Sequence, residues 1–193
     1  MILTTSAGRR FAAAAAVTCA AMLLPAVALA APRSAAASGQ ASGGPAVVPR
    51  CATADLTVWM GVPGDGAAGS SYYELQFSNT SSHACTILGF PGVSAIDVNG
   101  HQLGSAAGRD HSDATHLVTL GRGATAHVLL RIVDVGALPT CHPAAAVMLR
   151  IYPPNDSVSV PVPLSFSACK NRGPVYLFVR ATMSGTGIPG FSS

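Results

Sequence analysis

Three observations predict that this chain of 193 residues folds as an all-β domain. Several short stretches alternate apolar and polar side chains with a period of two, and clusters of Gly, Pro, Asn and Asp separate them. No stretch shows a convincing helical period, and an even set of cysteines follows an N-terminal export signal. Short strands at this spacing are typical of an antiparallel immunoglobulin-like β-sandwich, here of about 8–9 strands with two disulfides.

The chain begins with the features of an export signal. Arg9 and Arg10 form a basic start, residues 11–24 are apolar, and the triplet Ala-Leu-Ala at 28–30 matches a cleavage pattern. We therefore expect a signal peptide over residues 1–30 and a secreted, extracellular protein without a stable membrane span after cleavage. The apolar run is also long enough to remain as an uncleaved anchor. The adjacent arginines leave twin-arginine export open beside Sec export.

The cysteines indicate an oxidising compartment. One of the five, Cys19, lies inside the predicted signal, where a lipid-attachment role is an alternative. The others are Cys51, Cys85, Cys141 and Cys169. An even set in an exported chain predicts two disulfides, and the count alone leaves their pairing open.

Charge and composition limit the partners and the domain organisation. Without Arg9 and Arg10, the 11 Lys and Arg residues fall to nine, against 8 Asp and Glu. Nucleic acid is an unsuitable partner for so balanced a chain, because phosphate binding needs clustered cations. We expect a flexible Ala/Ser/Gly/Pro-rich tail at 31–49, one β-sandwich domain at 50–182 and a disordered C-terminal tail at 183–193. We also expect a monomer that either diffuses freely or associates with the cell wall.

The first two predicted strands show the alternation clearly. In 54–60, apolar Leu56 and Val58 flank polar Thr57, and 71–79 alternates in the same way, so each strand has one buried face. The later predicted strands are 85–88, 93–98, 115–120, 124–133, 146–152, 157–162 and 175–180. The turn signals between strands are Pro63–Gly66, Asn99–Gly100, Gly121–Gly123 and Pro153–Asp156. Asn-Gly is the strongest hairpin signal among them.

The stretch QFSNTSSHACTILGFPGV, at 76–93, connects two of these strands. Its Asn79-Thr80-Ser81 segment supplies side chains that hydrogen-bond a turn, and it also matches a glycosylation acceptor. Cys85 opens the next strand, where a disulfide can hold it. We interpret the stretch as a feature of the fold and not as a site.

Five stretches together resemble a known family. They are CATADLTV at 51–58, GDGAAGSSYYELQFSNTSSHACTILGFPGVSAIDVNG at 64–100, VTLGRGATAHVLLRI at 118–132, LRIYPP at 149–154 and FSAC at 166–169. They are similar to the secreted actinobacterial proteins grouped as domain of unknown function 4232. The resemblance implies an exported β-rich domain, often behind a signal peptide or lipoprotein anchor, without an established activity or catalytic residues. Chain order and the family pattern imply that Cys51 pairs with Cys85 and Cys141 with Cys169.

Enzymatic function is not expected. The sequence has no Gly-x-Ser-x-Gly or His-Glu-x-x-His motif. Glu74 is the only glutamate, so paired glutamates for glycoside cleavage are unavailable, and the aspartates lie mostly in predicted turns. We therefore expect no catalytic residue and no cofactor.

Metal handling is the alternative with the most definite chemistry. Asp110, His111, Asp113 and His116 lie within one short loop, with His101 on the preceding loop. Imidazole and carboxylate groups suit zinc or copper. A Gly/Ala/Ser-rich loop is more often simply solvated, because it gives the ligands no rigid support.

The leading hypothesis is a binding face. Six large side chains fall on strand positions opposite the aliphatic ones: Trp59, Tyr72, Met148, Tyr152, Tyr176 and Phe178. Exposed together, they would contact an unknown protein or glycan of the cell envelope, with Trp59 and Tyr72 as the favoured contacts. The alternative is that these strands are covered on both faces or that the register differs by one residue. A weaker alternative is a secreted hydrolase inhibitor that uses the disulfide-braced loop at 138–144.

Overall fold

The computed structural model describes residues 47–63, 66 and 69–187. The predicted signal peptide at 1–30, Cys19 and residues 31–46 of the predicted tail lie outside the described residues, as do residues 188–193 at the C-terminus. The predicted segment boundaries there stay predictions.

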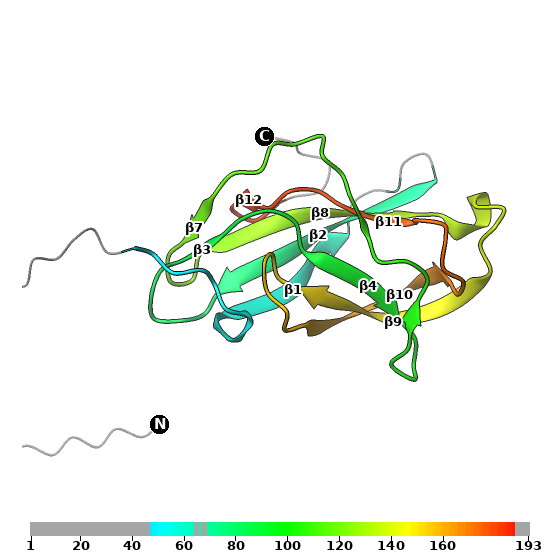
Figure 1. The fold of residues 1–193 in the computed structure, drawn as a ribbon, viewed down its shortest axis with the longest axis horizontal. Helices are drawn as coiled ribbons and strands as arrows, with labels where there is room; N and C mark the ends of the chain where they lie inside the picture. The colour runs from blue at the N-terminus through cyan, green and yellow to red at the C-terminus, as the bar shows by residue number, and fades with distance from the viewer. Residues whose placement is uncertain (1–46, 64–65, 67–68, 188–193) are drawn as a thin grey trace, which may run out of the picture. The chain divides into compact units, whose positions relative to one another are not determined.

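The described chain forms two larger antiparallel sheets and one small one (Figure 1). The large sheet has the order β1 (Leu56–Pro63), β2 (Ser70–Asn79), β8 (Thr125–Val133), β11 (Leu177–Val179) and β6 (Gly108–Arg109), and β12 (Met183–Ser184) also pairs with β8. The second sheet has the order β10 (Val160–Cys169), β9 (Pro143–Tyr152), β4 (Gly92–Ile96) and β5 (Gln102–Leu103). The small sheet pairs β3 (Cys85–Ile87) with β7 (Val118–Leu120), and two 3-10 turns are η1 (Thr53–Asp55) and η2 (Val135–Ala137).

The predicted all-β class, with antiparallel sheets and two disulfides, is confirmed. The described residues contain no α-helix, and the named strands pair antiparallel except β6 with β11. Apolar side chains from both larger sheets form one buried cluster. The immunoglobulin-like strand arrangement stays a prediction.

Alternation along β8 shows how the sequence positions the core. Its even-numbered residues from Ala126 to Ile132 are buried in the core, and its odd-numbered residues lie on the other side of the sheet. On β2 the same alternation places Leu75 and Phe77 in the core. However, Glu74 and Gln76 on the opposite side of β2 are also buried. Something must therefore cover the outer side of the large sheet at these two residues.

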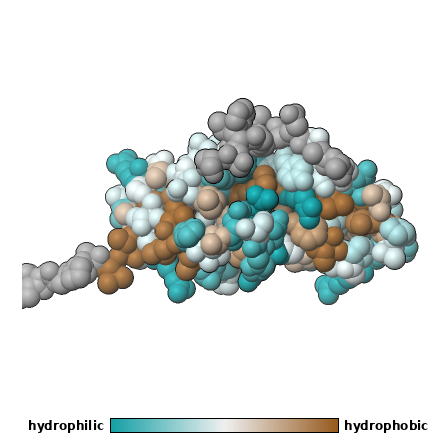
Figure 2. All heavy atoms as spheres, turned by 90° about the horizontal axis from the view of Figure 1, so that it is seen from above, coloured by the Kyte–Doolittle hydropathy of each residue, from teal (hydrophilic) through white to brown (hydrophobic). Residues whose placement is uncertain are grey.

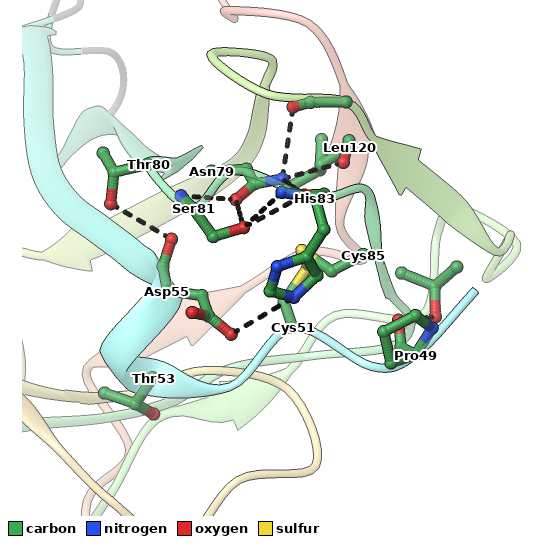
Figure 3. Close-up of a disulfide and its surroundings, with 12 residues drawn as sticks. Pro49, Cys51, Thr53, Asp55, Asn79, Thr80, Ser81, His83, Cys85 and Leu120 are labelled. Atoms are coloured by element: carbon green, nitrogen blue, oxygen red, sulfur yellow. Dashed lines mark hydrogen bonds and ion pairs between the residues drawn. A yellow bond between two sulfur atoms is a disulfide. The ribbon is translucent and has the colours of Figure 1, made fainter.

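The two disulfides have the pairing that the family resemblance implied. Cys51 bonds to Cys85, which ties the start of the domain to β3, and Cys141 bonds to Cys169, which ties the turn before β9 to the end of β10 (Figure 3 shows the first disulfide). The sequence separations are 34 and 28 residues. Loops of this length give each disulfide a stabilisation of about 3–4 kcal/mol in the chain-entropy model.

Asn79 organises the turn that follows β2 (Figure 3). Its Nδ2 donates to the backbone oxygens of His83 at 2.8 Å, Leu120 at 2.9 Å and Gly121 at 3.2 Å. Its Oδ1 accepts from Ser81 N at 3.0 Å and Ser81 Oγ at 2.8 Å. The side chain is fully buried, so it serves as a structural connection and is inaccessible to glycosylation in the folded domain.

Strand β10 is longer than predicted. The sequence predicted a strand that ends at Val162, but β10 continues to Cys169. Pro161 and Pro163 interrupt the pattern, and the pairing with β9 shifts register between Pro163 and Phe166. Prolines are tolerated because β10 lies at the edge of its sheet, where one side needs no ladder hydrogen bonds.

One end of the domain exposes apolar side chains beside the first described residues (Figure 2). Val47 and Val48 are exposed there. A nearby hollow of about 160 Å³ is lined by Arg50 and partly by Leu88 and Leu117, which are also exposed. Apolar surface is therefore present at and beside the first described residues.

Candidate functional site

The outer face of the large sheet is the candidate site. We use this name for the side away from the core, formed by Trp59, Tyr72, Glu74, Gln76, His127, Leu129, Arg131, Phe178 and Arg180. The strand pairing arranges these residues in rows across the sheet. Trp59, Gln76 and His127 are opposite one another in one row. Tyr72, Arg131 and Phe178 form another row, four residues further along β2.

The row of Tyr72, Arg131 and Phe178 forms a small hollow. The guanidinium carbon of Arg131 lies 4.4 Å from the centre of the Phe178 ring, a cation–π contact that holds the guanidinium over the ring. The hollow has a volume of about 70 Å³, and Leu129, Asp110 and Arg180 also line it. Arg131 Nε is buried and has no hydrogen-bond partner among the described residues. This end of the outer face therefore combines a fixed arginine with two aromatic rings.

Gln76 and His127, two residues of the other row, are covered by the end of the described chain. We call Met183–Gly187 the C-terminal strap. Its first two residues pair with His127 and Ala126 of β8, and its Gly187 oxygen accepts a hydrogen bond from Gln76 Nε2 at 3.4 Å. The strap explains the burial of the polar residues on β2, because it runs from β8 over the outer face to β2.

Burial under the strap changes the acidity of Glu74. Its side chain is on the outer face, yet only 5% of the residue is exposed. Desolvation raises the pKa of Glu74, although the nearby charges of His127 and Arg180 act in the opposite direction. Glu74 Oε2 has no hydrogen-bond partner among the described residues, and the same holds for Gln76 Oε1. The strap therefore buries two acceptor atoms that are left unpaired in this part of the chain.

Trp59 and Tyr72 lie on the same side of the sheet, as the hairpin of β1 and β2 requires. Trp59 is 39% exposed and its Nε1 donates to Ser78 Oγ at 3.0 Å. Tyr72 is half-buried. The cross-strand neighbour of Trp59 is Gln76, so the two aromatic residues are about 13 Å apart along the strand, taking about 3.3 Å per residue. They can contact one extended partner but do not form a single aromatic patch.

Three of the six large side chains that the alternation placed opposite the aliphatic positions do not lie on the outer face. Tyr176 is fully buried in the core and its hydroxyl donates to the Leu103 oxygen at 2.9 Å. Burial raises the pKa of Tyr176 to about 12. The residue precedes the first residue of β11, so strand alternation does not set its direction. Met148 and Tyr152 lie on β9 of the second sheet, and only Trp59, Tyr72 and Phe178 share the outer face.

The proposed metal ligands have other partners. Asp110 and Asp113 both pair with Arg180, at 3.6 and 3.5 Å. Hydrogen bonds from Ser112 lower the pKa of Asp110. The His111 ring packs against Phe90, with 4.8 Å between the ring centres. No cluster of three or more His, Cys, Asp or Glu side chains suited to a metal occurs among the described residues. A cation at this loop would compete with the Arg180 guanidinium for both carboxylates.

Two histidines of the metal hypothesis lie elsewhere. His116 lines a separate hollow with Leu117 and Met183. His101 is 3.5 Å from Asp97 in the turn between β4 and β5. The structure therefore does not gather the five predicted ligands.

The loop at 138–144 contains a compact turn that is held by an internal backbone hydrogen bond and by the side chain of Asn171. Cys141 N donates to the Leu138 oxygen at 2.9 Å. Asn171 accepts from His142 N at 2.7 Å and donates to the Thr140 oxygen at 2.8 Å. An inhibitor loop that fills a protease cleft needs an extended main chain, and Leu138–Cys141 forms a tight turn instead.

Several aspartates serve as acceptors in turns. Asp97 accepts from the backbone of Asn99 and His101, and Asp134 accepts from Gly136 N. Asp156 accepts from Thr53 N and Thr53 Oγ1, and hydrogen bonds, led by the one from the Thr53 side chain, lower the pKa of Asp156 to about 2. These carboxylates stabilise the fold, in agreement with their turn positions in the sequence.

Sequence patterns did not identify the arginine hollow or the strap. The sequence places Phe178 opposite the aliphatic positions, but its stacking with Arg131 depends on the pairing of β8 with β11. The available signal for the strap is Ser-Gly-Thr-Gly at 184–187, in the segment that the sequence predicts to be a disordered tail. That assignment is wrong for Met183–Gly187, because these residues pair with β8 and contact the outer face.

These features define a class: a disulfide-linked, antiparallel all-β domain with a partly covered polar and aromatic sheet face. A family model described as "Domain of unknown function (DUF4232)" matches residues 51–181, and the chain belongs to this family. Comparisons with curated proteins and with solved structures give no match. None of the described helical segments is long and apolar enough to cross a membrane.

Proposed function

We propose that this chain is an exported, non-enzymatic binding domain that contacts a protein or glycan of the cell envelope through its outer face. The observation that carries the proposal is the hollow at Tyr72, Arg131 and Phe178. Arginine and large aromatic residues contribute most of the binding energy at many interfaces. Arg131 is already held in place by Phe178, so binding costs little of its side-chain freedom.

Other features support a binding role in preference to catalysis. Asp97, Asp134 and Asp156 are engaged in turns, and Asp110 and Asp113 in ion pairs with Arg180. Among the described residues, few acidic groups therefore remain for acid–base chemistry. Trp59 extends the surface toward the other end of the outer face, which suits an extended partner.

Co-sedimentation with isolated bacterial cell wall tests this proposal. The oxidised chain from Ala31 to Ser193 is compared with Trp59→Ala, Tyr72→Ala and Arg131→Lys. The last variant keeps the charge but loses the planar stacking on Phe178. Tyr152→Ala is the matched control, because it removes a half-buried tyrosine from the second sheet.

We expect the wild type and the Tyr152 variant to pellet with the wall and the three outer-face variants to bind about fivefold or more weakly, as hot-spot residues do. Folded wild-type protein that stays in the supernatant would reject an envelope partner. Equal pelleting of all variants would move the contact away from the outer face.

A further inference from the structure

The C-terminal strap lies on the outer face in the manner of a bound peptide. After β12, Gly185 N donates to the Thr125 oxygen at 2.8 Å, which extends the pairing with β8. Gly185 has a φ of 82°, a conformation that favours glycine, and the chain turns there. The strap then crosses from β8 toward β2, with the Gly185 oxygen 2.9 Å from His127 Nδ1. Both strand pairing and side-chain hydrogen bonds thus recognise main-chain atoms of the strap.

The contact at Gly187 selects a residue without a side chain. A Cβ atom at this position would overlap the His127 ring and would lie 2.6 Å from Glu74 Oε2. A larger residue at this position would therefore require the His127 ring and the Glu74 carboxylate to move. The surface below Gly187 is shaped for an extended segment with glycine at this one place.

The strap makes poor hydrogen bonds with the polar side chains that it covers. The hydrogen bond from Gln76 Nε2 to the Gly187 oxygen is long, at 3.4 Å. Glu74 Oε2 and Gln76 Oε1 are buried without a partner among the described residues, which is unfavourable for closure. A segment that donates hydrogen bonds to these two oxygens would bind the same surface better than the described residues of the strap do.

The strap also lies outside the matched domain. The family match ends at residue 181, before the first residue of the strap. In the described chain, the edge of β8 at Thr125–His127 pairs with the strap on the side away from β2. Displacement of the strap would therefore expose a strand edge as well as the two polar side chains, a combination suited to the addition of a partner strand.

We propose that the surface under the strap is a binding site for an extended, glycine-containing peptide segment of a partner protein, and that Gly185–Gly187 occupies it in cis. The proposal rests on the function proposed above, because it takes from it that the partner binds the outer face. It adds that the partner is a peptide segment. Strap and partner compete for Glu74, Gln76 and His127, so release of the strap controls access to the site.

The test uses a fluorescently labelled synthetic peptide with the sequence of residues 182–193, TMSGTGIPGFSS. The protein is the oxidised chain from Ala31 to Ser193 carrying Gly187→Val, which disfavours closure of its own strap because His127 and Glu74 must move to admit the new side chain. Gly121→Val is the matched control, because a Cβ at Gly121 meets no atom within 4 Å. A chain that ends at Thr182 is a second open variant, and unfolding transitions establish that each variant is folded.

We expect both open variants to bind the peptide at least tenfold more tightly than the wild type and the Gly121 control. A peptide with valine in place of Gly187 should not bind. The single tryptophan, Trp59, gives a label-free readout, since it lies opposite Gln76 beside the strap. Folded open variants that bind no peptide, or that bind it no better than the wild type does, would overturn the proposal.

The outcome is separable from the cell-wall assay. Peptide binding without wall pelleting would support the peptide site and reject the envelope partner. If the open variants pellet with the cell wall but do not bind the peptide, the result would support the proposed function and reject the peptide site.

Discussion

Replacement of Asn79 by alanine should destabilise the domain strongly. The two hydrogens of Nδ2 serve three backbone oxygens, and Oδ1 accepts two hydrogen bonds from Ser81. Counting four independent hydrogen bonds at about 1 kcal/mol each gives a loss of about 4 kcal/mol. The loss is large because the side chain is fully buried and water cannot replace its partners.

Denaturant unfolding of the oxidised chain measures this loss as a shift of the midpoint. Ser81→Ala is the control, because it keeps the three Nδ2 contacts and should cost about 1 kcal/mol. Asn79→Asp should be at least as destabilising as alanine at neutral pH, since a buried carboxylate oxygen would face the oxygens of His83 and Leu120. The stability of the Asn79→Asp variant should recover partly in acid, where the protonated carboxyl can donate a hydrogen bond to one of these oxygens. A loss below about 1 kcal/mol for Asn79→Ala would refute the reasoning.

Three further predictions concern buried or shifted groups. Tyr176→Phe should cost about 1–3 kcal/mol in denaturant unfolding, because the buried Leu103 oxygen loses its donor; no measurable loss would contradict this. Asp156→Asn should destabilise the domain above about pH 4, and its difference from the wild type should shrink as the pH falls toward about 2, the lowered pKa. Glu74→Gln should gain stability relative to the wild type as the pH rises from about 4.3, because the closed state binds the Glu74 proton more tightly than the unfolded chain does; parallel pH profiles would argue against the raised pKa.

Predictions from the sequence succeeded where one strand and its covalent links decide the outcome. The alternation in β8 identifies its core side, because successive side chains of a strand point to opposite faces. The prediction failed for Tyr176, which precedes β11 and turns into the core instead of following the strand register. It also failed at β10, where an edge position removes the usual penalty for proline.

The sequence by itself determined the all-β class, the positions of most strands and, with the family resemblance, the disulfide pairing. These properties depend on local periodicity and on a few covalent constraints. Only the tertiary structure decided that Arg131 stacks on Phe178 and that the strap covers Glu74. It also decided that Arg180 forms ion pairs with both aspartates of the predicted metal loop. Each of these contacts joins residues about 50 or more positions apart or on different elements, so its geometry depends on how the strands pair in space and cannot be read from neighbouring residues.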